Sequence, residues 1–130
     1  MKKMTKQWVR KAEDDWAMAN ESSHSKTPLH DGVCFHCQQC AEKYLKALME
    51  EIGLTIPKTH DLDRLFDELI MHHRTLGLLR RGLAFLTNFA VAVRYPGDRA
   101  KKRQAVAALR WAERVRAACR LLLGMSPRAH

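Results

Sequence analysis

The sequence has no long apolar run and no secretory signal. No stretch approaches the roughly 18 consecutive apolar residues of a membrane-spanning helix, and the start, MKKMTKQWVRKAEDDW, lacks the apolar centre of a signal peptide. We therefore expect a cytoplasmic protein that does not enter a membrane. The 130 residues are 46% hydrophobic, which is enough for one core. We predict one helical domain over residues 1–125 and a frayed tail over 126–130.

Glycine and proline are also scarce, and no segment shows the alternation of apolar and polar residues that is typical of a strand. Apolar residues instead recur three and four positions apart, which is helical spacing. These segments predict an all-α fold, an up-and-down antiparallel four-helix bundle with one additional short helix. The expected helices cover about 5–24, 27–53, 62 to between 72 and 75, 76–93, and the segment that follows residue 98.

Residues at the expected helix ends have the chemistry of caps. Thr27 can cap the second helix with Pro28 in its first position, and Gly53 can end it in a left-handed conformation. Asp98 can cap the last helix. We expect the second helix to be long and to turn inward Cys34, Cys37, Ala41, Leu45, Leu48 and Ile52.

Acidic residues nearly disappear from the second half of the chain. Residues 1–73 hold 10 Lys or Arg and 12 Asp or Glu, whereas residues 74–130 hold 13 and 2. A polycationic half favours a phosphate-bearing ligand or an acidic protein partner, although a solvated arginine-rich face has the same composition. The last helix is predicted to turn inward Val106, Leu109, Ala112, Val115, Cys119 and Leu122, and outward Arg99, Arg103, Arg110 and Arg114.

The stretch CFHCQQC suggests a metal site because it holds Cys34, Cys37 and Cys40, but the second pair of ligands that such sites use is missing. On a helix Cys40 is rotated about 60° beyond Cys37, so the thiols spread over an arc instead of converging on one ion. We therefore predict that the cysteines are core residues and that the protein holds no metal and no cofactor. His60 stands at the start of a helix, where it can bond to a loop or face a ligand, and we favour the structural role.

Three blocks of the sequence together resemble the HEPN domain family, named for higher eukaryotes and prokaryotes and for nucleotide binding. The blocks are FHCQQCAEKYLKAL, PKTHDLDRL and RYP, in the family's order and spacing. The resemblance implies a four-helix bundle, a homodimer, binding of nucleotide or RNA, and often a minimal nucleotidyltransferase as the partner in a toxin–antitoxin pair. The signature residues of this sequence, with mainly structural roles, are Gln39, Glu42, Lys43, His60, Arg94, Tyr95 and Pro96.

The sequence departs from the family's ribonucleases in one respect. The resemblance implies that those enzymes cleave RNA without a metal and carry an arginine, here Arg94, that is followed a few residues later by a histidine. Arg99, Ala100 and Lys101 fill that window in this chain. We therefore expect a non-catalytic nucleotide- or RNA-binding protein. The alternatives are a metal-independent endoribonuclease that uses another base, such as His60, and a structural dimer that docks an acidic protein.

The binding interpretation gives several residues a role. Arg94 would clamp phosphate, and Tyr95 would stack on a base or accept a nucleotide from the partner enzyme. Lys43, Lys46 and His60 would add further contacts. The structural alternative for the arginine and the tyrosine is capping and packing around the proline that follows them.

Part of the signature also predicts a structural network. Gln39, Glu42 and Lys43 are spaced to take part in hydrogen bonds between helices, and Glu42 with Lys46 has the orientation of an i,i+4 ion pair. On this interpretation the signature identifies the fold and does not itself contact a ligand.

Overall fold

The computed structural model describes residues 1–91 and 95–128, and every regular element within these ranges is helical, which confirms the predicted all-α class. Two of the elements, η1 and η2, are 3-10 helices that flank α4. The elements are α1 (Lys3–Ser23), α2 (His30–Glu51), α3 (Leu62–Leu69), η1 (Arg74–Leu79), α4 (Arg80–Leu86), η2 (Thr87–Phe89) and α5 (Lys102–Leu122).

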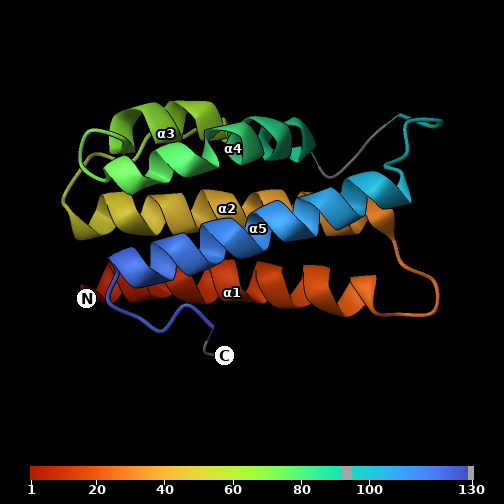
Figure 1. Cartoon of the computed structure of the whole chain (residues 1–130), viewed down its shortest axis with the longest axis horizontal. Coiled ribbons are helices and arrows are strands. Elements are labelled where there is room, and N and C mark those ends of the chain that lie inside the picture. The colour runs from red at the N-terminus through yellow and green to blue at the C-terminus, as the bar shows by residue number, and fades with distance from the viewer. Residues whose placement is uncertain (92–94, 129–130) are drawn as a thin grey trace.

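Helix α2 lies in the middle of the molecule. Figure 1 shows α1 on one side of it and α3 and α4 on the other, with α5 running alongside. In α2, 13 of the 22 residues are buried. A surface helix buries a single stripe of side chains, so other helices pack against more of the surface of α2 than that. The N-terminus and the end of α5 lie at one end of the molecule, whereas the α1–α2 and α4–α5 connections lie at the other (Figure 1). No helix in the two described ranges is long and apolar enough to cross a membrane.

The predicted start of the second helix is wrong. Helix α2 begins at His30, and neither Thr27 nor Pro28 belongs to it. Leu29 is extended, with φ −93° and ψ 91°, and its N–H donates to the hydroxyl of Ser22 (3.3 Å). The connection from α1 is therefore held by the end of that helix, and the chain turns helical only after Leu29.

The predicted end of α2 is confirmed. Gly53 has φ +78°, the left-handed conformation that glycine adopts without steric cost. Its N–H donates to the carbonyl of Glu50 (3.2 Å), and that of Leu54 to the carbonyl of Met49 (3.0 Å), which is the pattern of a Schellman motif. Ile52, expected to face inward, is instead 38% exposed at this end.

The prediction of one continuous fourth helix over 76–93 is wrong. Within the described residues this segment consists of η1, the two-turn α4 and η2. A Cβ on Gly82 would lie 2.1 Å from Cε3 of Trp111, so α4 packs directly against the indole ring of α5. Glycine costs about 1 kcal/mol in a helix relative to alanine, and Gly77 weakens the same segment further.

The last helix also begins later than predicted. Asp98 does not cap it, because the N–H of Asp98 donates to the carbonyl of Tyr95 (2.9 Å) and closes a turn in which Gly97 has φ +97°. The chain enters α5 through Lys101, whose N–H donates to Oε1 of Gln104 (2.8 Å). The turn formed by residues 95–98 therefore precedes α5 and is not part of that helix.

The amphipathic character of α5 is confirmed in its centre. Ala112, Val115 and Cys119 are fully buried, as their spacing predicts. Val106 is 45% exposed and does not belong to the inward stripe. The arginines predicted to face outward are all exposed, namely Arg99, Arg103, Arg110 and Arg114.

Candidate functional site

The signature residues of α2 surround a buried carboxylate. Glu42 is 3% exposed, and its Oε2 accepts a hydrogen bond from Lys46 Nζ (3.0 Å) while its Oε1 accepts one from His60 Nδ1 (2.9 Å). Gln38 Nε2 donates to the backbone carbonyl of His60 (2.9 Å), and Gln39 Nε2 donates to Oε1 of Gln38 (2.8 Å). The two contacts with His60 join α2 to the segment that starts α3, whereas the bond that Gln39 donates lies within α2 and not between helices as predicted. The contacts of Glu42 also include the i,i+4 pair that its spacing from Lys46 suggests.

His60 is held on one side and exposed on the other. Its side chain is 69% exposed, yet Nδ1 faces a carboxylate that can only accept a hydrogen bond. Nδ1 therefore carries the proton, and the neutral ring keeps the lone pair of Nε2 for a proton or a ligand. Asp61 caps α3, and the N–H of Leu62 donates to Oγ1 of Thr87 (3.0 Å), which places this segment beside the end of α4.

A second buried carboxylate joins α1 to α2. Asp15 is 6% exposed and accepts hydrogen bonds from Lys43 Nζ and from His36 Nδ1 (2.8 Å). Sequence reasoning missed Asp15, although a signal was present. It follows Ala12 by three residues and precedes Ala19 by four, and this helical spacing places it on the same face of α1 as these two buried alanines.

A third cluster ties α1, α2 and α5 together. Glu13 accepts hydrogen bonds from the Tyr44 hydroxyl and from Nε (2.7 Å) and Nη2 (2.8 Å) of Arg116, and Arg120 Nη1 lies 3.7 Å from its Oε1. Burial raises the pKa of Glu13, but the hydrogen bonds from Arg116 and Tyr44 outweigh it, so the pKa lies below its ordinary value. Burial and the bond to Glu13 raise the pKa of Tyr44. No local pattern predicts this cluster, because its members are far apart in the chain.

Lys43 and Lys46, predicted to add positive charge to a ligand site, are both held by carboxylates. Lys43 pairs with Asp15, and Lys46 is 7% exposed and pairs with Glu42. Nζ of Lys46 also lies 5.7 Å from the ring centroid of Trp8. Both lysines thus stabilise the packing of α2 against its neighbours.

The RYP block is described only in part. Arg94 lies outside the described residues, so its role stays a prediction. Tyr95 is 83% exposed, and Pro96 and Gly97 form the centre of the turn that precedes α5. The phenol of Tyr95 is therefore accessible to a ligand or to a modifying enzyme.

The cysteines lie in the core, as predicted, and each is 0% exposed. Burial, together with the charge of Cys34, raises the pKa of Cys37, and burial also raises the pKa of Cys40 and of Cys119. A thiol that stays protonated is a poor nucleophile and a poor metal ligand. In the part of the chain that the structure describes, no three His, Cys, Asp or Glu side chains are grouped to hold a metal ion.

Helix α5 carries a row of exposed arginines. Arg103, Arg110 and Arg114 are separated by seven and four residues and share one face, about 10 and 6 Å apart along the helix axis. Within residues 1–91 and 95–128, none of these three guanidinium groups forms a salt bridge. That of Arg114 lies 5.0 Å from the ring centroid of Trp111. We call these three residues the α5 arginine row.

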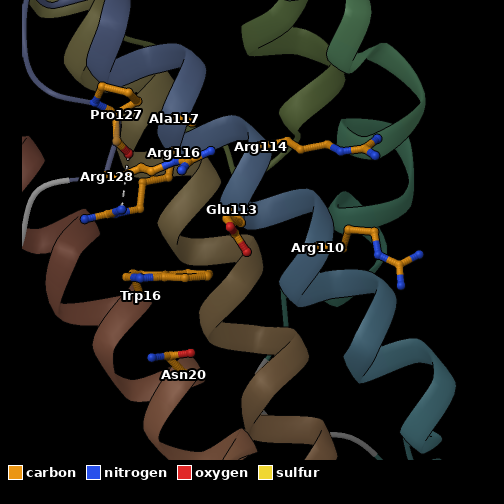
Figure 2. Close-up of a pocket in the computed structure, with 9 residues that line it drawn as sticks. All are labelled: Trp16, Asn20, Arg110, Glu113, Arg114, Arg116, Ala117, Pro127 and Arg128. Carbon is orange, nitrogen blue, oxygen red and sulfur yellow. Dashed lines mark hydrogen bonds between the residues drawn. The ribbon is translucent and has the colours of Figure 1, made fainter.

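An open groove of about 530 Å³ separates α1 from α5 (Figure 2). The guanidinium of Arg116 lies 5.8 Å from the ring centroid of Trp16, and its Nη1 donates to the carbonyl of Pro127 (3.4 Å). The C-terminal tail reverses at Gly124, where φ is +77°, and returns to line the groove. The lining residues are Trp16, Asn20, Arg110, Glu113, Arg114, Arg116, Ala117, Pro127 and Arg128.

These features define a small all-helical domain in which the signature residues of α2 and His60 take part in polar contacts and the last helix presents exposed arginines. The family model of the HEPN domain matches residues 5–122, and the chain belongs to that family, as the three sequence blocks predict. No curated protein and no solved structure matches the chain.

Proposed function

We propose that this HEPN protein is a non-catalytic component of a two-component, toxin–antitoxin-like system, that it binds RNA or nucleotide, and that its partner is a minimal nucleotidyltransferase. The observation that carries the binding function is the α5 arginine row, which is exposed and free of salt bridges within the described residues. Phosphate contacts need cations that are not already neutralised by carboxylates. The row meets this condition, whereas Lys43 and Lys46 do not.

Salt-dependent RNA binding tests the proposal. Fluorescence anisotropy with a labelled single-stranded RNA should show an affinity that falls steeply with salt. Each phosphate contact to a single strand contributes about 0.7 to the slope of log affinity against log salt. Replacing Arg103, Arg110 and Arg114 together by alanine should therefore lower the slope by about 2.

A matched variant controls for net charge. Lys26, Lys58 and Arg74 are exposed and lie outside α5, so replacing them by alanine removes the same charge from other surfaces. This variant should keep most of the salt slope. If the wild-type protein binds neither RNA nor nucleotide at low salt, the proposal fails and docking of an acidic protein becomes the better interpretation.

The proposed partnership makes Tyr95 the acceptor of a nucleotide. Of the two tyrosines in the chain, Tyr95 is 83% exposed and Tyr44 is fully buried. Incubation with ATP and a minimal nucleotidyltransferase from the same genome should add nucleotide mass to the intact protein. Tyr95→Phe should abolish the addition and Tyr44→Phe should retain it, whereas an unmodified wild-type protein would contradict the assignment.

We also expect a homodimer, with a sedimentation mass about twice 15.0 kDa.

A second candidate function, a metal-independent endoribonuclease, is favoured by one observation. The His60 ring is exposed while buried Glu42 fixes its Nδ1, so Nε2 is oriented to take the proton of an RNA 2′-hydroxyl. RNA incubated with excess protein and EDTA should then be cleaved by the wild type and by a His72→Ala control, but not by His60→Ala. RNA that stays intact with the wild-type protein would exclude this activity and leave the binding proposal standing.

A further inference from the structure

We propose that the groove between α1, α5 and the C-terminal tail is a binding site for an unpaired guanine nucleotide. This inference rests on the proposed nucleotide- or RNA-binding function and names the base that the groove selects. It concerns a part of the molecule other than the turn at Tyr95, which lies in the α4–α5 connection at one end of the helices (Figure 1).

The groove has the size of a ligand site and an aromatic surface inside it. Its volume of about 530 Å³ lies within the range of small-molecule pockets. Trp16 is half-buried in it, and Figure 2 shows the indole plane between the Arg116 guanidinium and Asn20. An indole in a basic groove is a stacking surface for a nucleobase, and stacking alone accepts any base.

Glu113 supplies the selectivity that stacking lacks. It is the only Asp or Glu from residue 99 to the end of the sequence. Figure 2 shows its carboxylate on the side of α5 that faces Trp16, while the guanidinium groups of Arg110 and Arg114 extend away from it. Glu113 is exposed and, in the two described ranges, forms no salt bridge, and Arg116 directs its own guanidinium to Glu13.

The chemistry of a carboxylate points to guanine. An ionised carboxylate has two acceptor oxygens and no donor, so it binds best to a group that presents two adjacent N–H donors. Guanine presents N1–H and the N2 amino group side by side on its Watson–Crick edge. Adenine, cytosine and uracil each present a single donor group there, beside an acceptor that would face the carboxylate.

The rim of the groove is suited to the phosphates of the same nucleotide or of a continuing strand. Arg110, Arg114 and Arg128 line it and are exposed. Trp111 supports the guanidinium of Arg114 from beneath at 5.0 Å, which limits the conformations that this side chain can adopt. Base recognition by Glu113 and phosphate contacts by the arginines therefore occur in adjacent parts of one site.

Titration calorimetry of the full chain with GMP, AMP, CMP, UMP and inorganic phosphate tests the site. At low salt GMP should bind at least about tenfold more tightly than the other ligands, as expected for one good bidentate contact. Glu113→Gln should remove the preference for GMP, and because Glu113 is exposed this variant should fold. The matched control is Glu21→Gln, which changes an exposed carboxylate of α1 outside the groove and should leave the preference intact.

Two RNA hairpins identify the source of the nucleotide. One carries its only unpaired guanine in the loop, and the other has the same composition with every guanine paired. Tighter binding of the first hairpin would assign the site to RNA, whereas selective binding of GMP alone would assign it to a free nucleotide, and either result supports the guanine site. Equal binding of the four nucleotides, phosphate binding as tight as GMP, or no effect of Glu113→Gln would overturn it. If RNA still bound with a salt slope that depends on the α5 arginine row, the proposed function would stand without the guanine site.

Discussion

Buried and half-buried carboxylates hold the helices of this protein together. Asp15 and Glu13 on α1 and Glu42 on α2 each accept hydrogen bonds from a cationic side chain, and Lys43 and Lys46 are two of the donors. A buried carboxylate without such a partner would cost several kcal/mol, so each pair depends on both of its members. Charged residues on the inner faces of these helices thus have a structural role, and the cations available to a ligand are the exposed ones, which include the α5 arginine row.

Replacing Glu13 by glutamine should lower stability at neutral pH by about 2 kcal/mol, because it weakens charge-assisted hydrogen bonds from Arg116 and Tyr44. The pKa of Glu13 is lower in the folded state than its ordinary value, so its contribution is present above the ordinary value and is lost as pH falls through the folded one. Urea unfolding of wild type and Glu13→Gln across this acidic range should give free energies that converge. A constant difference between them would contradict the assignment.

The cysteine thiols should be unreactive in the native protein. Burial raises the pKa of Cys37, Cys40 and Cys119, so the reactive thiolate is scarce even in mildly alkaline solution. Ellman's reagent should react slowly with the folded protein and rapidly in denaturant. Fast labelling of several thiols under native conditions would show that this part of the core is open to solvent.

The local contacts of single residues could be predicted, and the distant ones could not. The pair of Glu42 and Lys46 is one helical turn apart, so its spacing alone indicates it. Glu13 and Arg116 are 103 positions apart, and only the packing of α1 against α5 brings them together. The orientation of Glu113 toward Trp16 depends on the same packing, which is why sequence reasoning found the arginines of α5 and missed the groove.

At the scale of helices, the contact between α4 and α5 depends on one glycine. Replacing Gly82 by alanine would place a Cβ 2.1 Å from Trp111 and should destabilise the protein by about 1–3 kcal/mol through overpacking. At Gly32 in α2 the nearest atom to a new Cβ would be Leu29 Cβ at 3.9 Å, so Gly32→Ala should be neutral or stabilise by up to about 1 kcal/mol. Thermal unfolding of both variants gives the comparison, and an equal shift in the two would show that Gly82 is not a packing requirement.

The same contact explains which helices the sequence could predict. Apolar periodicity identified α1, α2 and α5 because each is long and buries a regular set of residues. It overextended the fourth helix because nothing local distinguishes Gly82, which faces an indole, from a glycine that merely weakens a helix. Thr27 and Asp98 have the chemistry of caps, but the chain enters the next helices through hydrogen bonds that the N–H groups of Leu29 and Lys101 donate to the side chains of Ser22 and Gln104.

Over the whole molecule, α2 is the helix against which the other α-helices pack. It contacts α1, α3, α4 and α5, and its buried side chains include Tyr44, Leu45 and Leu48. Among residues 1–91 and 95–128 the buried apolar side chains form one core cluster, to which each of the α-helices contributes. The positive charge of residues 74–130 is displayed largely on the outside of this core, and part of it lies on α5.

Unfolding should accordingly be one cooperative transition. Trp8 and Trp16 report on α1 and Trp111 reports on α5 by fluorescence, while circular dichroism reports on all the helices. Because α2 contacts each of the other four α-helices, the two signals should give the same urea midpoint. Replacing fully buried Leu45 by alanine should lower both midpoints equally, through a loss of about 2–5 kcal/mol. A circular dichroism transition that precedes the fluorescence change would instead mean that α3 and α4 unfold separately, and α2 would then anchor only α1 and α5.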